Sequence, residues 1–88
     1  MDIGDLVYSK AGRDKDAYFV VINKPNEKYC EISDGKTRKT DNPKLKKEKH
    51  LERVGRYEEI TCLFEQEEAF TNKQLRKAIN EVVANINY

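Results

Sequence analysis

The residues best suited to do chemistry in this chain are the cations between Lys36 and His50, where seven Lys or Arg side chains accompany two acidic ones. Four of them follow a proline within one short stretch: Lys44, Lys46, Lys47 and Lys49. Ammonium groups at this density attract phosphates and release the counterions that surround a polyanion. The 88-residue chain as a whole carries a net charge of only +1. The cluster therefore predicts a local polyanion-binding surface, and the alternative is a solubilising loop with no partner.

We expect this cluster to lie on a loop that is anchored at both ends. The triplet Asp41-Asn42-Pro43 interrupts regular structure before it, and Leu51 belongs to a candidate strand after it. A loop held in this way presents its charge at fixed places, so binding need not order a flexible tail. A closed barrel would also bring the turn around Gly12 close to the loop after Asp34. The cations of the two loops would then form one patch: Lys10, Arg13 and Lys15 with Lys36, Arg38 and Lys39.

No group of residues predicts an enzyme. His50 is the only histidine, and no serine or cysteine near it in sequence suggests a nucleophile pair. Asp14 and Asp16 are interleaved with cations, as in a mixed-charge loop. Cys30 and Cys62 lie outside any CxxC pair, and we expect both to be buried free thiols. We therefore expect no catalytic residue, metal, cofactor or small-molecule substrate.

Short strands separated by turn residues are predicted for the first two thirds of the chain. Five consecutive β-branched or aromatic residues, 18–22, predict a central strand. Shorter strands are predicted over 6–8, 29–33, 36–40 and 49–54. Strands of this length and spacing favour a small barrel or sandwich.

The last third of the chain carries a different pattern. Residues 56–66 alternate apolar and polar side chains, which predicts one additional strand. Residues 71–87 predict a helix, because Thr71 and Gln74 form a capping box and apolar residues then recur at helical spacing. We expect the apolar stripe of this helix to pack on the strands and enlarge a core that is otherwise small.

Four features of residues 3–54 are more specific together than singly. In chain order they are Gly4 before the first strand, Gly12-Arg13 in the first loop, the strand 18–22, and the turn Asp34-Gly35 followed by a lysine-rich segment that ends at His50-Leu51. In this order and spacing they resemble a KOW-motif RNA-binding protein. In particular, the segment is similar to the fourteen-e type of large-subunit ribosomal protein and its small bacterial relatives.

The resemblance implies a mainly β fold, in which residues 3–54 form a small SH3-like β-barrel. Together with the strand 56–66 and the helix 71–87, this barrel would make residues 1–88 a single domain. It also implies binding of structured RNA, with ribosomal RNA and the ribosome as partners. The KOW-loop contacts would be Lys10, Gly12, Arg13 and Lys15, and the basic side would be lined by Arg38, Lys39, Lys44, Lys46, Lys47 and Lys49.

Two further considerations bear on function. Asp14 and Asp16 reduce the positive field at the tip of the first loop, which shifts weight to the lysine-rich segment. SH3-like barrels also serve as protein-interaction modules without RNA contact, and the net negative charge of residues 56–88 favours that alternative. No run approaches the roughly 20 apolar residues of a membrane span, and the N-terminus lacks a basic stretch before an apolar one. We therefore expect a cytoplasmic protein with no membrane partner.

Overall fold

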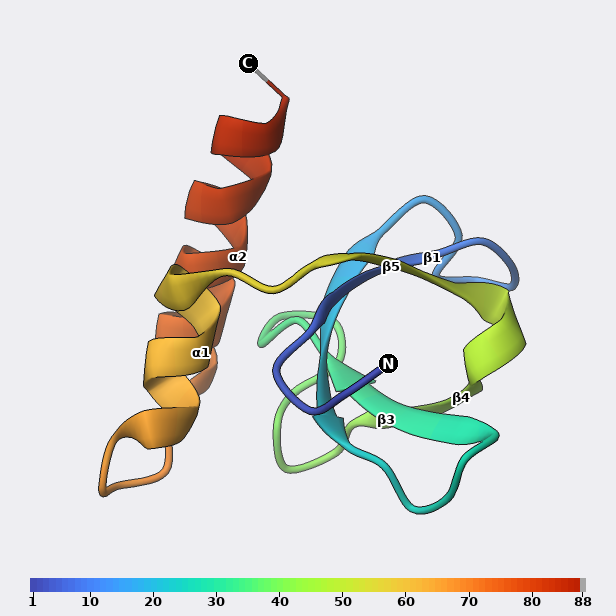
Figure 1. Cartoon of the computed structure of the whole chain (residues 1–88), viewed down its shortest axis with the longest axis horizontal. Coiled ribbons are helices and arrows are strands. Elements are labelled where there is room, and N and C mark those ends of the chain that lie inside the picture. The colour runs from blue at the N-terminus through green and yellow to red at the C-terminus, as the bar shows by residue number, and fades with distance from the viewer. Residues whose placement is uncertain (88) are drawn as a thin grey trace.

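The computed structural model describes residues 1–87, which form a five-stranded antiparallel sheet and two α-helices (Figure 1). The strands are β1 (Leu6–Ser9), β2 (Tyr18–Asn23), β3 (Tyr29–Ser33), β4 (Lys44–Lys47) and β5 (Leu51–Gly55). Their spatial order is β4-β3-β2-β1-β5, and one 3-10 turn, η1 (Glu48–His50), joins the two edge strands. The helices α1 (Glu58–Glu65) and α2 (Asn72–Ile86) follow the sheet. The prediction of a mainly β chain with a C-terminal helix is confirmed.

Strands β1 and β2 are buried on both faces. On the inner face of the curled sheet, Val7, Phe19 and Val21 pack with buried side chains from β3 and β5. On the outer face, Leu6 and Val20 pack against α1 and α2, which lie on the same side of the sheet in Figure 1. A strand that is covered on both sides reads as a continuous apolar run, which is why 18–22 is the most apolar stretch of the chain.

Helix α2 begins at the predicted capping box. The Thr71 hydroxyl accepts a hydrogen bond from the Gln74 N–H at 3.1 Å, and the Gln74 side chain accepts one from the Thr71 N–H at 2.9 Å. Four residues of its predicted apolar stripe are buried: Leu75, Ala78, Ile79 and Val82. Val83 is half-buried, and Ile86 at the end of the helix is exposed, contrary to the prediction. Neither helix in residues 1–87 is long and apolar enough to cross a membrane.

The strand predicted over 56–66 is wrong, because residues 58–65 form α1. Alternation and helical spacing coincide here, and Ile60 and Leu63, three residues apart, are the two side chains that the helix buries. Because this segment is a helix and not a strand, Cys62 points to solvent, and the prediction that it is buried is wrong. Cys30 is buried, as predicted.

The strand predicted over 36–40 is also wrong, since residues 34–43 form a long connection between β3 and β4. The Asp34 carboxylate folds its first turn by accepting hydrogen bonds from the Lys36 and Arg38 N–H groups, both at 2.9 Å. Further along, the Thr40 N–H donates to the Asn72 side chain at 2.8 Å. These bonds satisfy main-chain groups that a strand would otherwise pair, and they attach the connection to the start of α2.

Asp5 fastens the start of β1 to the end of β5. Its buried carboxylate accepts hydrogen bonds from the Asp2 N–H at 2.8 Å, from Arg53 Nε at 3.0 Å and from Arg56 Nη1 at 3.2 Å. Burial raises the pKa of Asp5, but the Asp2 N–H and the two guanidinium groups lower it by more, so the net pKa lies below its usual value. The carboxylate therefore contributes stability as long as it is ionised.

We predict that Gly35→Ala destabilises the fold more than Gly12→Ala does. Both glycines have positive φ, +74° and +79°, so both variants are strained. At Gly35 the new methyl group would also overlap the main-chain oxygen of Asn72, whereas at Gly12 the nearest atom is Lys46 Nζ at 3.4 Å. We expect losses of about 2–4 kcal/mol at Gly35 and about 1–2 kcal/mol at Gly12 in denaturant unfolding. Equal losses would contradict the tight contact between residue 35 and α2.

We predict that Asp5→Asn lowers the free energy of unfolding by about 2–3 kcal/mol at pH 7. Because the pKa of Asp5 is lower in the folded state, its contribution is present above the unfolded value of 3.8 and is lost as pH falls through the folded value. The gap between wild type and variant should therefore narrow below about pH 4. The control is Asp2→Asn, because the Asp2 side chain is exposed. A gap that stays constant down to pH 2 would contradict this role.

Candidate nucleic-acid interface

The loop that joins β1 to β2, residues 10–16, is closed by main-chain hydrogen bonds. The Ser9 N–H donates to the Ala17 carbonyl at 3.0 Å, and the Lys15 N–H donates to the Gly12 carbonyl at 3.2 Å. Gly12 has φ +79°, the left-handed conformation that glycine adopts without strain. The loop is therefore an ordered turn, and its charged side chains start from fixed main-chain positions.

Two tyrosines stand on the outer face of the sheet beside this loop. The rings of Tyr8 and Tyr18 meet edge to face with centroids 5.2 Å apart, and both side chains are half-buried. The Tyr8 hydroxyl donates to the Asp16 carboxylate at 2.7 Å, which raises the pKa of Tyr8 and holds Asp16 at a positive φ of 70°. One of the two loop carboxylates is thus engaged with a neighbouring hydroxyl, and both tyrosine side chains remain partly exposed beside the loop.

Lys46 supports the loop from inside the sheet. Cross-strand pairing places it opposite Cys30 on the inner face, where its side chain is 8% exposed. Its ammonium group donates to the Ala11 carbonyl at 2.5 Å. Lys46 was predicted to contact RNA, and burial excludes it from that role in this conformation. It positions the loop instead.

Arg38 connects the loop to the 34–43 connection. Its guanidinium group lies 3.2 Å from the Asp14 carboxylate, which is largely buried. The predicted approach of the two loops is therefore confirmed, and the negative charge of Asp14 is matched locally. The hydrogen bond from the neutral Tyr8 hydroxyl adds no positive charge, so Asp16 still reduces the positive field at the loop tip.

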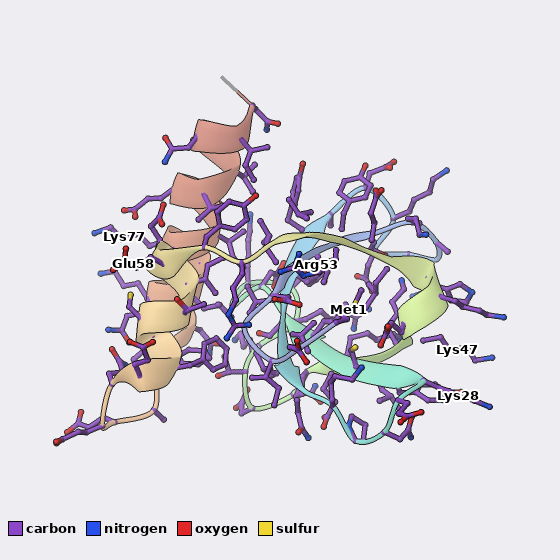
Figure 2. The ribbon with its side chains drawn as sticks, in the orientation of Figure 1. Met1, Lys28, Lys47, Arg53, Glu58 and Lys77 are labelled. Atoms are coloured by element: carbon purple, nitrogen blue, oxygen red, sulfur yellow. The ribbon has the colours of Figure 1, made fainter. Side chains whose placement is uncertain are left out.

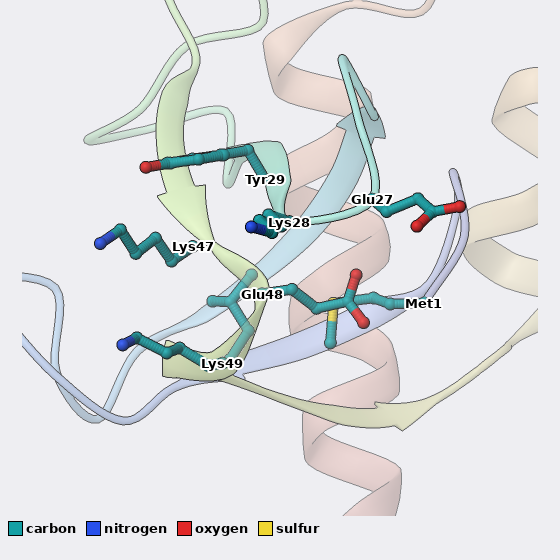
Figure 3. Close-up of a pocket in the computed structure, with 8 residues that line it drawn as sticks. Met1, Glu27, Lys28, Tyr29, Lys47, Glu48 and Lys49 are labelled. Carbon is teal, nitrogen blue, oxygen red and sulfur yellow. The ribbon is translucent and has the colours of Figure 1, made fainter.

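The remaining predicted cations separate into two groups. The first group belongs to the β1–β2 loop, the 34–43 connection and the start of β4, and its six members are exposed and form no ion pair within residues 1–87: Lys10, Arg13, Lys15, Lys36, Lys39 and Lys44. Lys47 and Lys49 lie elsewhere and, with Lys28, line a hollow of about 840 Å³. Figure 3 shows Lys47 and Lys49 extending to one side of this hollow and Glu48 turning toward Met1. Figure 2 places Lys28 and Lys47 together on the side of the sheet away from the helices.

The prediction that the lysine-rich segment is one anchored loop is therefore wrong. Residues 44–47 form strand β4, and 48–50 form a 3-10 turn. Side chains alternate across a strand, so Lys44 and Lys46 share one face while Lys47 points to the other. The β1–β2 loop is therefore favoured over the lysine-rich segment as the polyanion-binding surface.

The sequence interpretation missed a third group of cations on α2. Lys73, Arg76 and Lys77 are exposed, and Arg76 shares a small hollow with Lys36 from the 34–43 connection. Their spacing of three and four residues on the polar side of an amphipathic helix was visible in the sequence. This spacing does not indicate which strand or loop lies next to the three cations in the fold.

The chain was compared with known proteins. No protein-family model and no curated protein matches it. In residues 1–87, no group of three or more His, Cys, Asp or Glu side chains is placed to hold a metal ion.

We predict that Lys46→Met loosens the β1–β2 loop without removing an exposed charge. The variant keeps an apolar chain of similar length but leaves the Ala11 carbonyl without its ammonium donor. We expect a loss of about 1–3 kcal/mol and faster amide hydrogen exchange at Lys15 and Asp16. The control is Lys47→Met on the exposed face of the same strand, which should change stability by less than about 0.5 kcal/mol. Unchanged exchange in Lys46→Met would contradict the supporting role.

Proposed function

We propose that this chain is a KOW-type RNA-binding protein. In this proposal the curled sheet is an SH3-like barrel, whose edge strands β4 and β5 are brought together by η1. The β1–β2 loop contacts phosphates of structured RNA, with ribosomal RNA as the expected class, in the cytoplasm. The protein binds its RNA and carries out no reaction on it.

The observation that carries the proposal is the ordered, cation-bearing loop 10–16. Lys46 holds it from below and Arg38 holds it from the side, while Lys10, Arg13 and Lys15 remain exposed. Phosphate binding by charges that are already in place releases counterions without a large ordering cost. A solubilising loop needs no such support.

Segregation of the acidic residues supports the same proposal. Of the six exposed glutamates in residues 56–87, Glu81 lies on α2, and the other five lie on α1 or just beyond it: Glu58, Glu59, Glu65, Glu67 and Glu68. Figure 2 shows Glu58 on the helical side of the molecule. Within residues 1–87, none of these carboxylates forms an ion pair with a cation of the β1–β2 loop. Within the loop, the three cations Lys10, Arg13 and Lys15 outnumber the two carboxylates, so a local positive charge remains although the net charge of the chain is only +1.

Recognition by such a surface follows shape and phosphate spacing more than base identity. Lysine and arginine contacts to phosphates fix position and orientation but carry no sequence information directly. The partly exposed rings of Tyr8 and Tyr18 offer one place for an unpaired base beside the loop. We therefore expect a preference for folded RNA with unpaired nucleotides over a plain duplex.

We predict that neutralising the loop reduces the salt dependence of RNA binding. The test variant combines Lys10→Gln, Arg13→Gln and Lys15→Gln, and the probe is a synthetic stem-loop RNA in a salt titration. If these three cations each neutralise one phosphate, the slope of log K against log salt should become less steep by about 2–3.

The matched control combines Lys28→Gln, Lys47→Gln and Lys49→Gln, which removes the same charge from the hollow on the other side. The control should change the slope by much less. Equal slopes in the two variants would show that only net charge matters. No binding of wild-type protein at low salt would overturn the RNA proposal and favour the protein-docking alternative.

A further inference from the structure

A groove runs between the sheet and α2, close to the β1–β2 loop. Its walls come from three segments that are distant in sequence: the start of β2, the turn after β3 and the middle of α2. Tyr18, Lys36, Arg76 and Asn80 are its polar or aromatic lining residues beside Asp34, and the hollow measures about 210 Å³. None of the α2 residues belongs to the surface that the sequence predicted.

The groove is built by close packing of the turn on the helix. Gly35 lies so near the Asn72 carbonyl and the Arg76 N–H that no side chain fits between them. The Thr40 N–H fixes the connection to the Asn72 side chain a second time, at 2.8 Å. Lys36 and Arg76 are therefore brought to the same hollow by fixed main-chain contacts.

The charge on this surface is positive and unpaired. Lys36 and Arg76 form no ion pair within the described part of the chain, and the same holds for Lys73 and Lys77 in the adjoining hollow on α2. Two carboxylates share these hollows, Asp34 and Glu81, so four cations face two anions. Asp34 is occupied by its own turn, where it accepts hydrogen bonds from Lys36, Thr37 and Arg38.

The spacing of these cations is unfavourable for the helix by itself. Lys73 and Lys77 lie four residues apart, where like charges destabilise an isolated helix. The glutamates of the neighbouring α1 do not relieve this repulsion, because none forms an ion pair with them in residues 1–87. Glu81, four residues after Lys77, offsets part of this repulsion, and an external polyanion would relieve the rest.

The groove is also continuous with the β1–β2 loop. Arg38, two residues beyond Lys36, lies 3.2 Å from Asp14 of that loop, and Ala17 and Tyr18 line the groove directly after the loop. We propose that the RNA interface extends along this groove onto α2, where Lys36 and Arg76 hold a backbone phosphate from either side. The inference rests on the proposed RNA-binding function and assigns the C-terminal helix a direct part in it.

The test is a salt titration with the same synthetic stem-loop RNA, using the full chain with Lys36→Gln and Arg76→Gln together. Both side chains are exposed, so thermal unfolding should be unchanged. If the two cations together neutralise one phosphate, the slope of log K against log salt becomes less steep by about 0.7–0.9. The control is Lys28→Gln with Lys47→Gln, which removes the same charge from the side of the sheet away from the helices.

The outcomes separate the two proposals. A groove variant that behaves like its control, while the Lys10, Arg13 and Lys15 variant loses salt dependence, overturns the inference and leaves the proposed function standing. Loop and groove variants that both behave like their controls overturn both. A slope change in the groove variant beyond that of its control supports the extended interface.

Discussion

The burial of β1 and β2 on both faces is the constraint on which the rest of the structure depends. Phe19 and Val21 fill the inside of the curled sheet, while Leu6 and Val20 hold the two helices on its outside. A chain of this size buries a smaller share of its surface than a larger domain does, so two thin cores on one pair of strands must serve both layers. The loop between these strands is consequently fixed at both ends by the best-buried part of the molecule. The main-chain positions that carry the charged side chains of this loop are therefore fixed as well.

Buried polar contacts extend this order to the surface. Lys46 reaches through the inner face to the Ala11 carbonyl, and Arg38 joins the β1–β2 loop to the connection that packs on α2. Each contact uses a cation that composition alone would assign to the binding surface. The same side chain cannot be buried as a support and exposed as a contact, so fewer cations are available for RNA than the sequence suggests. Those that remain start from an ordered main chain.

The sequence predicted the elements with a strong single pattern and failed where two patterns coincide. The run 18–22, the turn at Gly12 and the capping box of α2 each depend on local chemistry, and each was found. Residues 58–65 satisfy both a strand and a helix period, and packing of Ile60 and Leu63 against the sheet decides for the helix. The split of the lysine-rich segment depends on the pairing of β4 with β3, and the groove depends on docking of a loop on α2. Neither the split of the segment nor the groove can be predicted from the residue types in the sequence.

The most direct measurement is an NMR titration of the full chain with a stem-loop RNA, in which main-chain amide shifts are followed at low and at high salt. The account predicts salt-sensitive shifts in residues 10–16, in 34–40 and in the first two turns of α2, with little change around Lys28, Lys47 and Lys49. Shifts confined to the hollow formed by those three lysines would contradict it. The absence of any shift at low salt would contradict it equally.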